Sequence, residues 1–117
     1  MTLRDRELLK CIIRYCDRII SYSERVNFSR DEFLRDSMVQ DACCMCIVQI
    51  GELVSLLSED LKGQHPEILW RAIKDTRNFY VHNYGSVDLD YVWNTMTEDI
   101  PSLQKWCKAY TKSEENQ

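Results

Sequence analysis

The feature that most constrains this fold is a three- and four-residue spacing of apolar side chains with very few helix breakers. In the N-terminal part the apolar set is Leu8, Leu9, Ile12, Ile13, Cys16, Ile19 and Ile20. This spacing places the side chains on one face of an α-helix. The 117 residues include only 3 glycines and 2 prolines, which is little turn material for a fold of many short strands. The sequence therefore predicts an all-α protein with a few long helices.

Capping signals mark the first two expected helices. Thr2 is expected to cap a helix that ends near Glu24. Ser29 and Glu32 form a capping box, which is expected to open a long second helix running to about Asp60. The expected inner face of this helix consists of Phe33, Leu34, Met38, Ala42, Cys46, Ile50, Leu53 and Leu57.

The second half of the chain predicts two further helices. A loop over 62–66 leads to Pro66, which suits the first turn of a third helix. Gly85 is a suitable residue to end it. Asp88 is expected to cap a fourth helix, which Pro101 should kink or split in two. These segments predict an antiparallel bundle of four to five helices.

Length and charge indicate one soluble domain. We expect residues 1–112 to form a single helical domain and residues 113–117 a polar tail. The formal charge of −4 is not typical of a protein that binds nucleic acid over a broad surface. The N-terminus has no signal-peptide core, and the longest apolar run, over 42–48, is too short to span a membrane. A cytoplasmic protein without a membrane contact is expected.

The six cysteines are expected to be free thiols that fill the core. A secreted disulfide scaffold normally has a signal sequence and many turns, and a zinc site normally has paired cysteines on loops. Free cysteine behaves as a small hydrophobic residue. The six positions are Cys11, Cys16, Cys43, Cys44, Cys46 and Cys107.

The third expected helix, W-R-A-I-K-D-T-R-N-F-Y-V-H-N-Y-G, concentrates reactive side chains. Arg77, His82 and Tyr84 lie within eight residues, and Arg71 and Lys74 lie just upstream. A guanidinium and an imidazole suit phosphate chemistry, and the two upstream cations could contact RNA phosphates. Each of these side chains could equally be an ordinary solvated group on a helix surface.

Helical geometry separates these candidates into two stripes. At 100° per residue, Arg77 and Tyr84 share one stripe, whereas Asn78 and His82 lie on a second. His82 lies about 140° round the helix from Arg77. A straight helix therefore does not bring the two together. A loosened last turn, or a second copy of the helix across a two-fold axis, would do so.

The chemistry that such a cleft favours is cleavage of RNA without a metal. The 2′-hydroxyl would attack the neighbouring phosphate, with His82 either taking its proton or protonating the leaving oxygen. Arg77 would stabilise the charge that develops on phosphorus. A metal site is disfavoured because the other histidine, His65, is on an expected loop and no carboxylate cluster has ligand spacing.

These residues resemble a known motif. Arg77-Asn78-x-x-x-His82-x-Tyr84 matches the Arg-x4-His-x-Tyr motif of the HepT-like toxins, a branch of the HEPN superfamily. The flanking segments are also similar, namely I-G-E-L from Ile50, P-E-I-L-W-R-A-I from Pro66, D-L-D-Y-V-W from Asp88 and D-I-P-S-L from Asp99. The resemblance covers roughly residues 45–106.

The resemblance implies a homodimeric HEPN-like bundle whose cleft is lined by Arg77 and His82 of both chains, with Asn78 supporting them. It implies a metal-independent endoribonuclease toxin that needs no cofactor. The implied partner is an antitoxin of the nucleotidyltransferase fold (MntA-like), which can transfer AMP to Tyr84. The alternative is a non-catalytic helical subunit that binds substrate for, or docks onto, a nucleotidyltransferase, with Trp70 and Tyr84 as contact residues.

Overall fold

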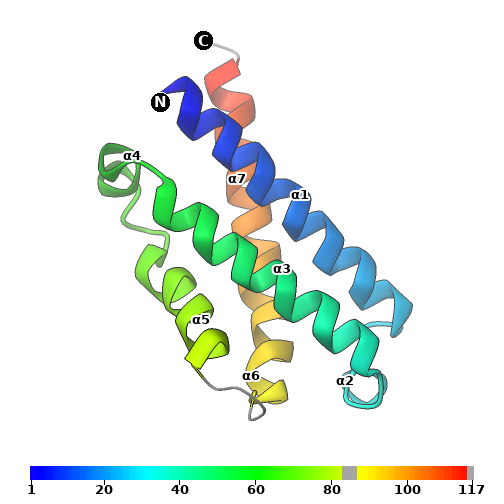
Figure 1. The fold of residues 1–117 in the computed structure, drawn as a ribbon. Helices are drawn as coiled ribbons and strands as arrows, with labels where there is room; N and C mark the ends of the chain where they lie inside the picture. Colours follow the sequence, from blue (N-terminus) through cyan, green and yellow to red (C-terminus); the bar gives the residue numbers. More distant parts are fainter. Residues whose placement is uncertain (83–86, 116–117) are drawn as a thin grey trace.

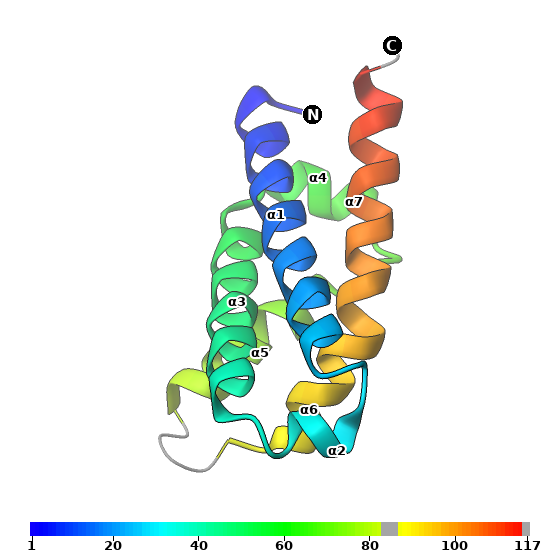
Figure 2. The same ribbon diagram turned by 90° about the vertical axis from the view of Figure 1, so that its right-hand side faces the viewer.

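A computed structural model describes residues 1–82 and 87–115, and within 77–82 it describes the backbone only. The described residues contain helices and no strand, so the expected all-α class is confirmed. The elements in chain order are α1 (Leu3–Arg25), α2 (Arg30–Phe33), α3 (Ser37–Leu56), α4 (Glu59–Gln64), α5 (Trp70–His82), α6 (Leu89–Asn94), η1 (Thr95–Asp99) and α7 (Ile100–Glu115). Figures 1 and 2 show long helices running side by side, with α2 and α4 as short connecting turns.

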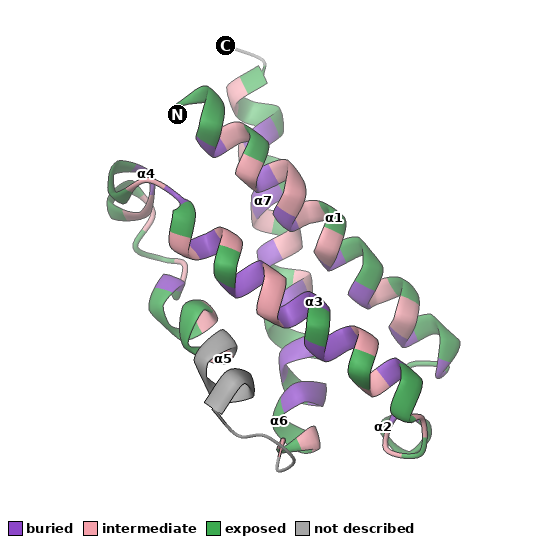
Figure 3. Cartoon of the chain, viewed as in Figure 1, coloured by how far each residue is buried: buried purple, intermediate pink, exposed green. Residues whose placement is uncertain are grey.

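The core lies between α1, α3 and α7. Helix α1 packs against both α3 and α7, and α3 packs on its other side against α5. Figure 3 shows that buried positions recur along α1 and α3 between exposed ones. The predicted inner face of α1 is confirmed, since Leu9, Ile12 and Ile19 are all completely buried. Packing of such faces, more than helix propensity, stabilises helices in proteins.

Three predicted helix caps are confirmed. The Thr2 hydroxyl accepts a hydrogen bond from the amide of Asp5 at 3.0 Å, and the Ser29 hydroxyl accepts one from the amide of Glu32 at 3.3 Å. The carboxylate of Asp88 accepts hydrogen bonds from two amides at the start of α6. These side chains satisfy amide groups that have no partner within the first turn of a helix.

The expected continuous helix from Ser29 to Asp60 is wrong. Helix α2 is one turn long, and Asp36 caps a new helix, α3, by accepting from the amide of Val39 at 3.1 Å. Met38, expected inside, is 82% exposed. On one unbroken helix, Phe33 would lie about 65° from the centre of the buried face of α3, at the edge of that face. In the observed fold Phe33 is fully buried, and its ring packs against that of Trp93 with centroids 5.2 Å apart.

The connection to α5 also differs from the prediction. Residues 59–64 form α4, which Ser58 caps. At these positions the sequence predicted the end of the second helix and a loop. This turn buries Leu61, which is 3% exposed. Pro66 lies in a turn, and α5 begins four positions later at Trp70. The expected end of this helix at Gly85 lies outside the described residues.

The expected irregularity near Pro101 takes the form of a π-helical turn. Helix α6 continues through η1 into α7 without a separating loop. Proline lacks an amide hydrogen and its ring clashes with the carbonyl four residues earlier in a regular α-helix. The wider turn of η1, just before Pro101, accommodates this ring within a continuous rod.

Helix α3 is the most apolar helix of the described chain. By length and composition alone it could cross a membrane, but 44% of its apolar window is buried inside the fold. Its buried side packs between α1 and α5, which is the position of a core helix.

The cysteines are free, and five are buried, as expected. Burial raises the pKa of Cys43 to about 12, that of Cys44 to about 11 and that of Cys107 to about 12. An apolar environment disfavours the charged thiolate. Cys11 differs because it is partly exposed.

Candidate functional site

Helix α5 carries the backbone of most of the predicted site. The main chain of Arg77, Asn78 and His82 belongs to this helix, whereas Tyr84 lies outside the described residues. The side chains of all four also lie outside what the structure describes. Their roles therefore remain predictions, and the described geometry is that of the helix that carries them.

The N-terminal end of α5 is anchored by Trp70. This side chain is 9% exposed, and its indole nitrogen donates a hydrogen bond to the carbonyl of His65 at 3.0 Å. Its ring lies edge-on to that of Trp106 on α7, with centroids 5.3 Å apart. Buried indole N–H groups normally require such a partner. Trp70 thus fixes where the motif-bearing helix starts.

His65 has a structural role in this turn. Its Nδ1 lies 3.1 Å from the carboxylate of Glu67, and its ring packs edge-on against Trp106 and Tyr110 of α7. The pKa of Glu67 is lowered, first by a hydrogen bond from its own backbone amide and then by the contact with His65. The cluster holds the segment between α4 and α5 against α7.

Arg71 and Lys74 are exposed on α5, as a role in phosphate contact requires. They are three residues apart and so lie on the same side of the helix. Asp75, which is also exposed, borders them. This side of α5 offers two cations within one turn of each other.

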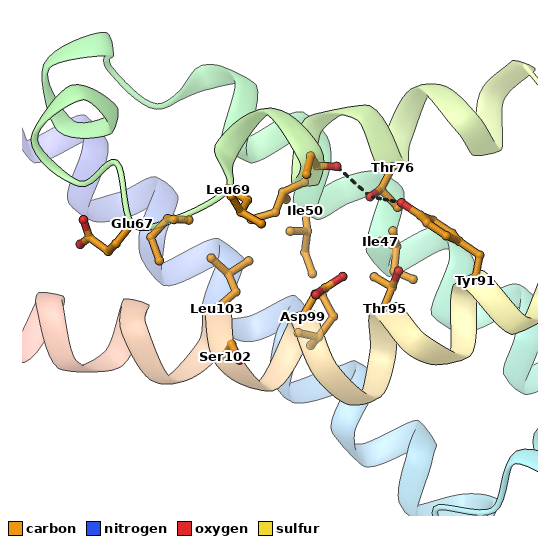
Figure 4. Close-up of a pocket in the computed structure, with 14 residues that line it drawn as sticks. Ile47, Ile50, Glu67, Leu69, Thr76, Tyr91, Thr95, Asp99, Ser102 and Leu103 are labelled. Carbon is orange, nitrogen blue, oxygen red and sulfur yellow. Dashed lines mark hydrogen bonds between the residues drawn. The ribbon is translucent and has the colours of Figure 1, made fainter.

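The opposite side of α5 lines a groove of about 290 Å³ (Figure 4). Its floor comes from Ile47 and Ile50 of α3, and its far wall comes from α6, η1 and α7. Ala72, Ile73 and Thr76 form the near wall. At 100° per residue these three centre roughly 150° from Arg71 and Lys74. The groove and the exposed cations therefore lie on different faces of one helix.

Polar groups of the groove come from both walls. The Thr76 hydroxyl lies 3.1 Å from the carbonyl of Ala72, to which it donates, and 3.4 Å from the hydroxyl of Tyr91. Since Thr76 has one hydroxyl hydrogen, Tyr91 is the donor in the second contact. The pKa of Asp99 is raised, first by burial and then by the neighbouring charge of Glu98.

No pattern in the sequence indicates this groove separately. Asp88, Asp99 and Tyr91 belong to the segments that carry the family resemblance, but their spacing alone indicates only a cap and a helix face. One wall of the groove comes from α5, the other comes from α6, η1 and α7, and α3 forms the floor. The groove therefore depends on the tertiary arrangement of these helices.

Comparison with known proteins assigns the chain to a family. The family model described as "Ribonuclease HepT-like" matches residues 12–110. "Probable ribonuclease HepT" of Thermococcus cleftensis is 33% identical over 99 residues, which are 85% of this chain and 88% of that protein. "Putative RNase MJ1216" of Methanocaldococcus jannaschii is 29% identical over 106 residues, or 90% and 86% of the two chains. No solved structure matches the chain.

The family match includes α5 and the whole Arg-x4-His-x-Tyr segment, together with both walls of the groove. The all-helical architecture and the matched length agree with it. The resemblance seen in the motif is therefore confirmed, and the chain belongs to the HepT-like ribonuclease family.

Proposed function

We propose that this protein is the toxin of a toxin–antitoxin pair and acts in the cytoplasm as a homodimeric, metal-independent endoribonuclease. The observation that carries the proposal is the family match over residues 12–110, which contains the complete motif. The exposed Arg71 and Lys74 on the motif-bearing helix support it.

The proposed reaction is transesterification within RNA. The 2′-hydroxyl oxygen bonds to the adjacent phosphorus while the bond from phosphorus to the 5′-oxygen breaks. His82 accepts the 2′-hydroxyl proton or supplies a proton to the leaving 5′-oxygen. Arg77 stabilises the extra negative charge on the phosphoryl oxygens, with Asn78 in support. The products are a 2′,3′-cyclic phosphate and a 5′-hydroxyl end.

A dimer supplies the geometry that a single straight helix lacks. Arg77 and His82 are about 140° apart by helical periodicity. Two-fold pairing would place an arginine from one copy near a histidine of the other. Arg71 and Lys74 would hold flanking phosphates on the outer face of α5, because short stretches of cations attract the RNA backbone locally.

Control of the enzyme would act on Tyr84. A nucleotidyltransferase-fold antitoxin would transfer AMP from ATP to the phenolic oxygen and release pyrophosphate. The added bulk and negative charge near Arg77 would repel an RNA phosphate. Mass spectrometry of the toxin after incubation with this partner and ATP should show one or more AMP additions that are absent in Tyr84→Phe.

The activity is tested with purified protein and single-stranded RNA in EDTA. We expect cleavage by the wild type and its loss in Arg77→Ala and His82→Ala, with circular dichroism showing that both variants remain folded. Arg35→Ala is a matched control, since Arg35 is exposed in the turn between α2 and α3. Cleavage that survives both motif substitutions would overturn the proposal. Absence of cleavage by the wild type, with partner binding lost in Arg77→Ala, would favour the docking-subunit alternative.

A further inference from the structure

We propose that the groove between α5 and the α6–α7 rod binds an amphipathic helix of a protein partner, one that presents an apolar face bordered by lysine or arginine. The inference rests on the proposed function only in assigning RNA to the other face of α5. The groove is thus a protein-docking surface on a ribonuclease.

The shape and apolar lining of the groove fit a helix. Ile47 and Ile50 at its floor are 5% and 1% exposed, and Leu103 on the far wall is 3% exposed. Leu69 stands at its rim and is 72% exposed. A channel between two diverging helices with an apolar floor is the kind of site in which an amphipathic helix inserts side chains spaced three and four residues apart.

The charge of the groove selects the partner. Glu67 lies at one end and Asp99 near the middle (Figure 4). Among the described residues that line the groove, these two carboxylates are the only charged groups. Negative lining repels RNA phosphates and attracts cationic side chains.

The position of the groove separates it from Arg71 and Lys74, which are expected to hold the flanking RNA phosphates. Ala72, Ile73 and Thr76 form its wall, whereas Arg71 and Lys74 project from the opposite side of the same helix. A cationic helix in the groove would therefore contact α5 without covering Arg71 and Lys74. A partner could hold the toxin through the groove while the other face of α5 stays accessible.

The carboxyl of Asp99, which lines the groove, is the most specific recognition point. Its pKa is raised because burial and Glu98 both disfavour its charge. A lysine or arginine of the partner would offset this cost by pairing with the carboxylate. Charge complementarity of this kind contributes specificity at interfaces.

The test uses a fluorescein-labelled synthetic amphipathic helix built of leucine and lysine, with fluorescence anisotropy as the readout. A second peptide with the same leucines but glutamate in place of lysine is the charge control. We expect the wild type to bind the leucine–lysine peptide and not the leucine–glutamate peptide. Asp99→Lys should weaken binding by about tenfold or more, whereas Glu98→Lys should change it far less.

Comparing Asp99→Lys with Glu98→Lys separates attraction of the peptide by the groove from its general attraction to an acidic protein. Both add the same charge to adjacent residues, but only Asp99 lines the groove. Leu69→Ser provides a second variant that leaves the core intact, since Leu69 is largely exposed, and it should also weaken binding. Equal weakening by Asp99→Lys and Glu98→Lys would overturn the inference, as would unchanged binding in both Asp99→Lys and Leu69→Ser.

Competition with RNA tests the assignment of the two faces. An excess of single-stranded oligonucleotide should not displace the peptide from the wild type. Displacement would show that RNA itself occupies the groove and would overturn the inference. Because peptide binding is measured without catalysis, a wild type that binds the peptide but does not cleave RNA would contradict the proposed function and leave this inference standing.

Discussion

Asp5, at the start of α1, accepts two hydrogen bonds from Ser58, which lies 53 positions further along the chain. Its carboxylate receives the amide of Ser58 at 2.9 Å and the hydroxyl of the same residue at 2.6 Å. The Ser58 hydroxyl also accepts a hydrogen bond from the amide of Leu61 at 3.2 Å. One buried carboxylate thus ties the first turn of α1 to the cap of α4, directly ahead of the segment that leads into α5.

Removing this carboxylate should destabilise the fold. In Asp5→Ala the amide of Ser58 loses its partner, and an unsatisfied buried donor costs about 1–3 kcal/mol. Urea unfolding followed by circular dichroism should show this loss. Glu7→Ala, an exposed acid two positions along α1, is the matched control and should stay within about 0.5 kcal/mol of the wild type. An equal effect of the two substitutions would contradict the assignment.

The same carboxylate should give stability a pH dependence. Burial alone would raise the pKa of Asp5, but hydrogen bonds from the hydroxyl and amide of Ser58, and then from Thr2, outweigh it and lower the pKa below its usual 3.8. The ionised form is therefore stabilised in the folded state. This contribution is complete above the ordinary pKa of the carboxyl and is lost as pH falls through the lower, folded value.

The stability difference between the wild type and Asp5→Asn should consequently be largest near neutral pH. It should shrink in acid, below about pH 4, as the wild-type carboxyl becomes protonated. Urea titrations of both proteins across this range provide the measurement. A difference that is constant with pH, or that grows in acid, would show that ionised Asp5 is not the stabilising form.

Thiol reactivity should distinguish Cys11 from the other five cysteines. Burial raises the pKa of Cys43 and Cys107 to about 12, so at pH 8 they hold almost no thiolate and are also shielded. Cys11 is partly exposed, and a guanidinium nitrogen of Arg14 lies 2.9 Å from its sulfur. Iodoacetamide should label Cys11 first in the native protein and all six in urea. Rapid native labelling of Cys43 or Cys107 would contradict the described core.

The indole of Trp70 should control the stability of the start of α5. In Trp70→Phe the hydrogen bond to the carbonyl of His65 is lost, which should cost about 1 kcal/mol. Hydrogen–deuterium exchange should accelerate most in the peptide containing the first turns of α5. Trp93→Phe is the matched exchange on α6, where the ring packs against Phe33 at 5.2 Å. It should not accelerate exchange in α5 selectively; if it does so as much as Trp70→Phe, the anchoring role is wrong.

Local signals in the sequence predicted helix starts better than helix lengths. Thr2, Ser29 and Asp88 cap helices as expected because a cap needs only a few neighbouring residues. The break before Asp36 could not be read in the same way. Nothing in the residues between Phe33 and Asp36 forbids a helix, and the contact that Phe33 makes is with Trp93, 60 positions further along the chain.

The sequence was sufficient to predict the motif of the candidate site, but it was not sufficient to predict the groove beside it. Helical periodicity separates Arg77 from His82, and the family match supports the motif. The groove opposite Arg71 and Lys74 required the three-dimensional arrangement, because its walls come from segments that are distant in sequence. In the sequence, Tyr91 and Asp99 are ordinary helix residues. They line a groove only because α5 lies opposite them in the fold.

The chemistry of the RNA ends left by the purified protein in EDTA tests the proposed ribonuclease function most directly. We expect fragments from the wild type to carry 2′,3′-cyclic phosphate and 5′-hydroxyl ends, and we expect no such fragments from folded Arg77→Ala or His82→Ala. Arg35→Ala should cleave as the wild type does. Cleavage that requires an added divalent metal, or that persists in both motif variants, would contradict a metal-independent reaction at Arg77 and His82.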